Sequence, residues 1–158
     1  MPKITVRADT IYRQHIDPRR LRAAALETLA HEDIPGRVEL TIAIAGDDEI
    51  RALNRRYRGV DAPTDVLAFG EGAAPAPFAV APGAPAYLGD VVISYPRAVA
   101  HADARRHSTA DELLLLVVHG VLHLLGYDHA TPGEKRKMWA AQRHVLHELG
   151  AQVRPGKR

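Results

Sequence analysis

One stretch of the chain, ELLLLVVHGVLHLL at residues 112–125, would be apolar on every side as a helix. A helix without a polar face is stable only in the interior of a domain, where other elements surround it. Ser108 is followed three residues later by Asp111, which is the spacing of a capping box and predicts that the helix begins there. We therefore expect the chain to fold around a central buried helix.

The segments on either side alternate between strand and helix patterns. Alternating apolar and polar residues predict half-buried strands, while Asp-Pro, glycine and capping residues predict where helices begin and end. The predicted strands are 3–8, 37–45, 65–69 and 89–94, and the predicted helices besides the central one are 18–34, 47–58, 96–107 and 133–149. This order indicates an α+β fold, in which a mixed sheet of about four strands packs with about five helices.

Length and composition indicate how the chain is organised. With 158 residues, of which 46% are apolar and 25% charged, the chain has the size and composition of one globular domain. We therefore expect residues 1–158 to form a single domain. Residues 70–87 are dominated by alanine, proline and glycine, so we expect a mobile loop there, and residues 151–158 form a basic C-terminal tail.

Charge and hydropathy limit the partners of the protein. The first residues lack the apolar run of a signal peptide, and no window approaches the roughly 18 apolar residues of a membrane span. We therefore expect a cytoplasmic protein with no membrane partner. The formal net charge is only +2, but arginines gather in short clusters that can form a positive face for phosphates, at 19–22, 55–58, 105–106 and in the tail.

Three histidines within or just after the central helix form a candidate metal site. His119 and His123 are four residues apart, so their rings point the same way from a helix. Gly126 can adopt the left-handed conformation that ends a helix and turns the chain back, which would bring His129 toward the other two rings. Three imidazoles leave a fourth tetrahedral position open, as in a catalytic zinc site.

The three histidines are interpreted as metal ligands rather than as core residues, and zinc is the metal expected. The chain contains 0 cysteines, so any metal must be held by histidine or carboxylate. Each histidine alone could be a hydrogen-bonded core residue, but three at ligand spacing together with the glycine turn favour a metal. We expect one zinc ion per chain, although three histidines also suit nickel, cobalt or copper. Five other histidines are interpreted as surface or cap residues, namely His31, His101, His107, His144 and His147.

The spacing of the three histidines also matches the zinc-protease pattern His-Glu-x-x-His-x-x-Gly-x-x-His, except at one position. Gly120 stands where the proteases have a glutamate. That glutamate is the base that acts on the zinc water and later protonates the leaving amine. Its absence speaks against a peptidase.

The stretch HGVLHLLGYDH at 119–129 resembles the signature of the YbeY family of bacterial rRNA maturation factors. LNRRYRGVDAPTDVLAF at 53–69 and LGDVVIS at 88–94 agree with the family in order and spacing, so the resemblance covers nearly the whole chain. Two departures are Ala68 and Gly70, which stand where the family usually has serine and proline.

The resemblance implies a zinc-dependent endoribonuclease that acts on single-stranded RNA, matures the 3′ end of 16S rRNA and takes part in ribosome quality control. It implies rRNA, the small ribosomal subunit and assembly factors as partners, with no DNA substrate. The family's zinc ligands fall on His119, His123 and His129, and its functionally important arginine falls on Arg58. A guanidinium can bind two phosphoryl oxygens at once, which suits Arg58 to a catalytic role.

Several alternatives remain open from the sequence. Asp65, Asp90 or Asp128 could accept a hydrogen bond from a ligand histidine, although such aspartates are more often turn or cap residues. The attacking group could be water activated by zinc or the 2′-hydroxyl of the RNA itself. Two other classes of protein are possible: a non-enzymatic ribosome-assembly factor with a structural zinc, and a metallohydrolase of another substrate such as a peptide.

Overall fold

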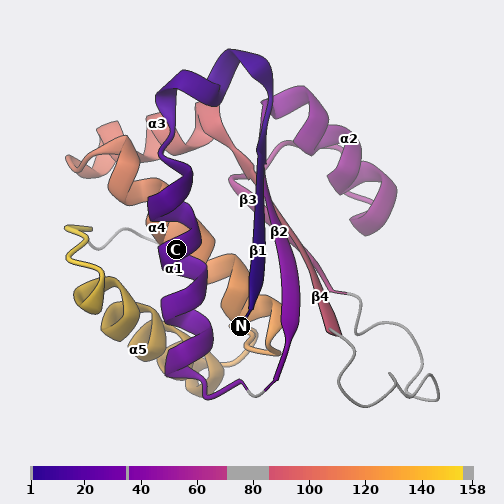
Figure 1. Ribbon diagram of the computed structural model, residues 1–158. Coiled ribbons are helices and arrows are strands. Elements are labelled where there is room, and N and C mark those ends of the chain that lie inside the picture. Colours follow the sequence, from indigo (N-terminus) through magenta and orange to yellow (C-terminus); the bar gives the residue numbers. More distant parts are fainter. Residues whose placement is uncertain (1, 35, 71–85, 155–158) are drawn as a thin grey trace.

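The computed structural model describes residues 2–34, 36–70 and 86–154 (Figure 1). Within them lie one four-stranded sheet and five α-helices, in agreement with the predicted α+β fold. The strands are β1 (Lys3–Ala8), β2 (Val38–Ala45), β3 (Val66–Gly70) and β4 (Ala86–Ser94). The helices are α1 (Pro18–His31), α2 (Asp47–Arg58), α3 (Tyr95–Arg105), α4 (Thr109–Leu124) and α5 (Pro132–Glu148).

The sheet is mixed, as predicted, with strand order β1-β2-β4-β3. The strands β1, β2 and β4 are parallel, and β3 runs antiparallel to β4 at the edge. Alternation along β2 buries Leu40, Ile42 and Ile44 on one face, where they join the main core. On the other face, Ile50 of α2 packs with Leu67 and Val92 in a smaller cluster.

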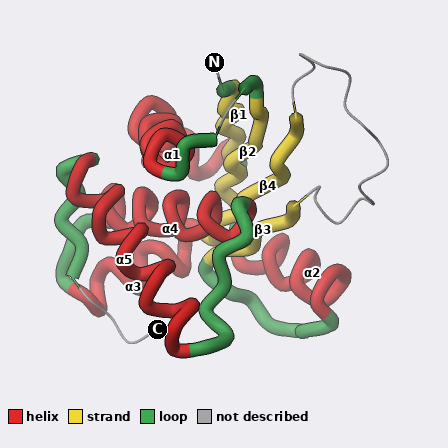
Figure 2. Tube along the Cα trace, turned by 90° about the horizontal axis from the view of Figure 1, so that it is seen from below, coloured by secondary structure: helices red, strands yellow, loops and turns green. Residues whose placement is uncertain are grey.

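The predicted central helix is α4. Its side chains are buried from Glu112 through Leu122, and the helix contacts α1, α3, α5, β3 and β4. Figures 1 and 2 show α4 among the helices on one face of the sheet, with α2 on the opposite face. Ser108 accepts a hydrogen bond from the backbone N–H of Asp111 at 3.0 Å, so the predicted cap is present. Because α4 is buried in the core, the helix that carries His119 and His123 is held firmly in place.

The structure differs from the predictions in one added element and at several boundaries, among them the end of α1 at His31 instead of residue 34. A 3-10 helix, η1 (Thr10–His15), follows β1 and was not predicted. The strand β4 begins at Ala86 instead of Gly89, because Ala86 and Tyr87 pair with β2 before a register shift that brings Gly89 opposite Leu40. Gly70 belongs to β3, so the predicted mobile loop at 70–87 is shorter at both ends, and its remainder, 71–85, lies outside the described residues.

Two further predictions concern the basic C-terminal tail and membrane-spanning helices. Of the basic tail at 151–158, the structure describes residues 151–154, whose backbone is hydrogen-bonded to the region where α4 begins. No helix of the described residues is long and apolar enough to cross a membrane.

Candidate metal centre

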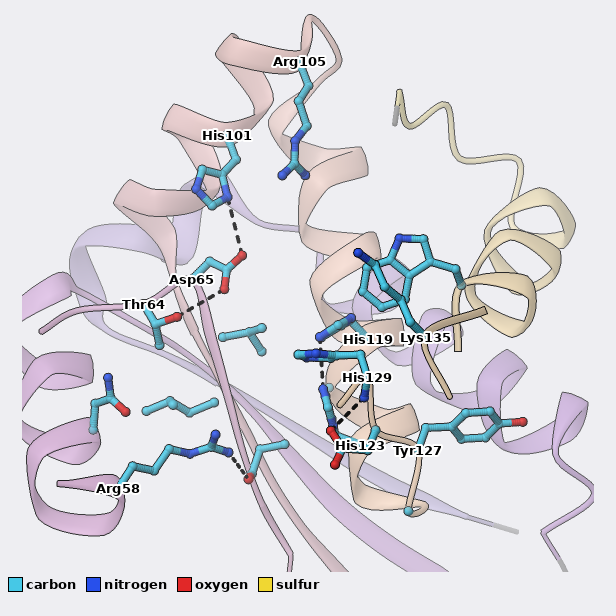
Figure 3. Close-up of a pocket in the computed structure, with 18 residues that line it drawn as sticks. Arg58, Thr64, Asp65, His101, Arg105, His119, His123, Tyr127, His129 and Lys135 are labelled. Carbon is cyan, nitrogen blue, oxygen red and sulfur yellow. Dashed lines mark hydrogen bonds and ion pairs between the residues drawn. The ribbon is translucent and has the colours of Figure 1, made fainter. Parts of the chain in front are cut away.

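The structure brings His119, His123 and His129 together at the end of α4 (Figure 3). The Nε2 atoms of His119 and His123 are 3.2 Å apart, and one ring nitrogen from each of the three residues lies within 4.8 Å of the others. His119 is 6% exposed, His123 is half-buried and His129 is exposed. The cluster therefore opens from a buried floor toward solvent.

The turn after α4 has the predicted form. Gly126 has a φ of +101°, which a glycine adopts without strain. Its N–H donates to the carbonyl of His123, and the N–H of Tyr127 donates to the carbonyl of Leu122, each at 3.0 Å. These bonds satisfy the last carbonyls of α4 while the chain reverses and carries His129 back to the helix.

The side chain of Tyr127 ties this turn to α1. Its hydroxyl is hydrogen-bonded to Glu32 at the end of α1, and this bond, together with burial, raises the pKa of Tyr127 to about 12. The loop that carries His129 is therefore attached to a second helix, in addition to its own backbone bonds.

The three side chains fit a zinc ion. Two nitrogens bound to one tetrahedral zinc at the usual bond lengths are about 3.3 Å apart, and the Nε2 atoms of His119 and His123 have nearly that separation. Burial lowers the pKa of His123, and the charge of His129 lowers it further, which favours the neutral form of the ring that binds metal.

Gln142 of α5 fixes the orientation of one of these rings. Its Oε1 lies 3.0 Å from Nδ1 of His119, and both side chains are buried. When Nδ1 carries the proton that Gln142 accepts, the lone pair of Nε2 points toward His123. The sequence offered a signal for this residue, because Gln142 is a polar residue on the core face of α5, between Met138 and Val145.

The three candidate aspartates are bonded to groups other than the ring of a ligand histidine. Asp65 pairs with His101, with 3.5 Å between Oδ2 and Nδ1. Asp90 accepts a hydrogen bond from the hydroxyl of Tyr87, and Asp128 accepts one from the backbone N–H of His129. The ring of His119 is bonded to the amide of Gln142, which belongs to another helix.

The histidines form one wall of a cleft of about 770 Å³. Arg58, at the end of α2, reaches this cleft from the opposite side, and its Nη2 donates to the carbonyl of Ala68 at 3.4 Å (Figure 3). Its charge also contributes to the lowered pKa of His123. Gly59 follows in the left-handed conformation and ends α2 at Arg58, so the cation stands at the rim.

The cleft also contains Arg105, which the sequence placed in a basic cluster, and residues that the sequence did not assign to a site, namely Thr64, His101, Lys135 and Trp139. The structure corrects the prediction that His101 and His107 are surface or cap residues. His101 of α3 lines the cleft beside Asp65, the residue that precedes β3. The side chain of His107 is 3% exposed and its Nε2 lies 2.7 Å from the buried Glu112.

Comparison with known proteins identifies the family. The family model described as "Endoribonuclease YbeY" matches residues 4–150. A protein of that name from Chloroflexus aurantiacus is 48% identical over 135 residues, covering 85% of this chain and 88% of the relative. Another, from Halalkalibacterium halodurans, is 42% identical over 154 residues and covers 93% and 89%, respectively.

A solved structure supports the fold. The solution structure of TM1509 from Thermotoga maritima superimposes with a TM-score of 0.60 at 24% sequence identity, covering 98% of this chain and 99% of that one. The match of the family model over most of the chain, together with the identity to these relatives, shows that the chain belongs to the YbeY endoribonuclease family.

Proposed function

We propose that this chain is a zinc-dependent endoribonuclease that cleaves single-stranded RNA, and that one domain, residues 1–158, carries the activity. The family fixes the reaction class as cleavage of RNA phosphodiester bonds in rRNA processing. The observation that supports the proposal most directly is the meeting of three imidazoles with Arg58 in one cleft.

His119, His123 and His129 would hold the metal, and Gln142 would keep the ring of His119 in the tautomer that binds it. When bound, a zinc ion supplies a Lewis acid that activates water and neutralises charge on a phosphoryl oxygen. Arg58 would bind the other non-bridging oxygen as negative charge grows on it during cleavage.

The depth of the site favours single-stranded substrates. His119 is nearly buried on the floor of the cleft, whereas His129 and Arg58 lie at its rim. A flexible strand can bend to bring one phosphodiester to that floor, while the backbone of an A-form duplex is held on a stiff cylinder. We therefore propose that paired RNA is a poor substrate.

We propose that the physiological substrate is the 3′ end of 16S rRNA, and that the protein also acts in ribosome quality control. The small ribosomal subunit and its assembly factors would then be its partners, and the cytoplasm its place of action. The exposed arginines of α2, Arg55 and Arg56, lie beside Arg58 and provide positive charge for additional phosphates of such a large RNA.

A metal analysis combined with a cleavage assay tests the proposal. The purified protein should contain about one zinc per chain, and it should cut a labelled single-stranded RNA faster than the same RNA in a duplex. His123→Ala should stay folded while it loses both zinc and cleavage. A folded His123→Ala protein that still cleaves RNA would overturn the catalytic role of the metal.

Two further measurements separate the alternatives. A substrate with a 2′-deoxy nucleotide at the cleaved position is still cut if water attacks, and is resistant if the 2′-hydroxyl of the RNA attacks. Casein treated with the same preparation tests for a peptidase. A protein that binds zinc but cuts neither RNA nor casein would be a non-enzymatic assembly factor.

A further inference from the structure

A second pocket of about 480 Å³ lies beside the metal cleft, between α5 and residues 151–154. Its apolar part is formed by Leu115, Leu146 and Val153, and three cations stand around it, Arg105, Arg143 and Arg154. Among the described residues that line it, none is acidic. The pocket therefore joins an apolar surface to a rim of guanidinium groups.

Trp139 connects this pocket to the metal cleft, because its side chain lines both. Its ring stands edge-on to His119 and His129, with centroid distances of 5.7 and 5.9 Å. Arg105 also lines both cavities, and Figure 3 shows it reaching from α3 toward the space above the histidines. A ligand in the second pocket would be one side chain away from the metal centre.

The rim of the second pocket is held in place by a buried carboxylate. Glu112 is 0% exposed, and its Oε1 lies 2.7 Å from Nε2 of His107 and 3.4 Å from Nη1 of Arg105. On the other side of the His107 ring, Nδ1 accepts a hydrogen bond from the backbone N–H of Arg154 at 3.1 Å. This chain of bonds fixes Arg105 and the backbone of Arg154 relative to α4, so the pocket is built from positioned groups.

We propose that the second pocket binds one nucleotide of the RNA strand, next to the nucleotides that cross the metal centre. This inference rests on the proposed RNA cleavage. A nucleobase is flat and apolar on its faces, which suits the apolar wall and the ring of Trp139. The adjoining phosphates carry the charge that Arg143 and Arg154 would bind. Binding by stacking and charge would tolerate any base.

The chain contains a single tryptophan, Trp139, so its fluorescence reports on this pocket directly. The probe is adenosine 5′-monophosphate, titrated into the full chain loaded with zinc. We expect it to quench the fluorescence, because a base would stack beside Trp139. Arg143→Glu should weaken this effect, since Arg143 lines the second pocket and not the metal cleft. Arg136→Glu, on the same helix but outside both cavities, is the matched control.

Cleavage kinetics provide the second readout. Arg143→Glu should raise KM for single-stranded RNA roughly tenfold and leave kcat within about twofold of the original. Loss of one phosphate contact should also reduce the slope of log(kcat/KM) against log salt by roughly 0.7. A protein with merely damaged structure would lose kcat and melting temperature instead.

The outcomes separate this inference from the proposed function. If Arg143→Glu and Arg136→Glu behave alike in quenching and in KM while RNA is still cleaved, the nucleotide pocket is wrong and the proposed function stands. If quenching is lost in His123→Ala but kept in Arg143→Glu, the nucleotide binds at the metal, which also overturns the pocket. If the unaltered protein cuts no RNA, the proposed function fails first.

Discussion

A Cβ atom placed on Gly120 would lie 2.5 Å from Cγ1 of Val91, far inside van der Waals contact. Helix α4 therefore packs closely against β4 at this point, with the side chain of Val91 directly against the backbone of Gly120. Zinc proteases with the same histidine spacing have their glutamate at the position of Gly120. In this fold the close packing of helix and strand excludes that glutamate, which gives a structural reason for the absence of the peptidase base.

Gly120→Ala should lower the free energy of unfolding by about 1–3 kcal/mol, because the new methyl group overpacks the contact with Val91. The measurement is denaturant unfolding of the metal-free protein. Val91→Ala removes the opposing methyl groups, so the double variant should be more stable than the sum of the two single changes predicts. Additive effects would show that the helix moves away from the strand at little cost.

Gln142→Leu should lower zinc affinity by about 10- to 100-fold, because the ring of His119 loses the acceptor at its Nδ1. Gln142→Glu keeps an acceptor oxygen and is the matched control, which should retain most of the affinity. Competition with a chromophoric chelator measures both, without any need for RNA. Equal affinities in the two variants would mean that Gln142 does not orient the ring.

Arg58→Ala should reduce RNA cleavage by about 10²-fold or more while zinc content and melting temperature stay unchanged. Arg58 is exposed at the rim of the cleft, so its removal should cost the fold little. Arg51→Ala on the same helix, exposed and outside the cleft, is the control. A loss of activity that parallels a loss of stability would assign Arg58 a structural role.

Tyr127→Phe should lower the free energy of unfolding by about 1 kcal/mol at neutral pH, because it removes the bond to Glu32. The pKa of Tyr127 is raised in the folded protein to about 12 from an ordinary value of about 10. Its contribution to stability is therefore complete below about pH 10 and disappears as the pH rises toward 12.

The free energy of unfolding, measured from pH 8 to 12, tests this pH dependence. The stability difference between the unaltered protein and Tyr127→Phe should be constant up to about pH 10 and should shrink above it. Zinc affinity should also fall in the variant, since the turn that carries His129 is less firmly held. A difference that grows with pH would contradict the assigned hydrogen bond.

Much of the site could be predicted from local spacing. His119 and His123 share a helix face because the helix period is 3.6 residues, and Gly126 allows the reversal that follows, so neither depends on distant residues. The same holds for the buried α4, whose apolar sequence leaves it no stable place at the surface. Local pattern therefore predicted the histidine cluster and the core of the fold.

Other parts of the site depend on contacts between residues far apart in the chain. Gln142 meets His119 from 23 residues away, and Arg58 faces the histidines across the cleft because α2 and β3 form its opposite wall. The periodicity of a single segment cannot predict these contacts, because they follow from how whole helices pack on the sheet. For the same reason His101 and His107 read as surface residues in sequence, although α3 packs against α4 and places one in the cleft and the other on a buried glutamate.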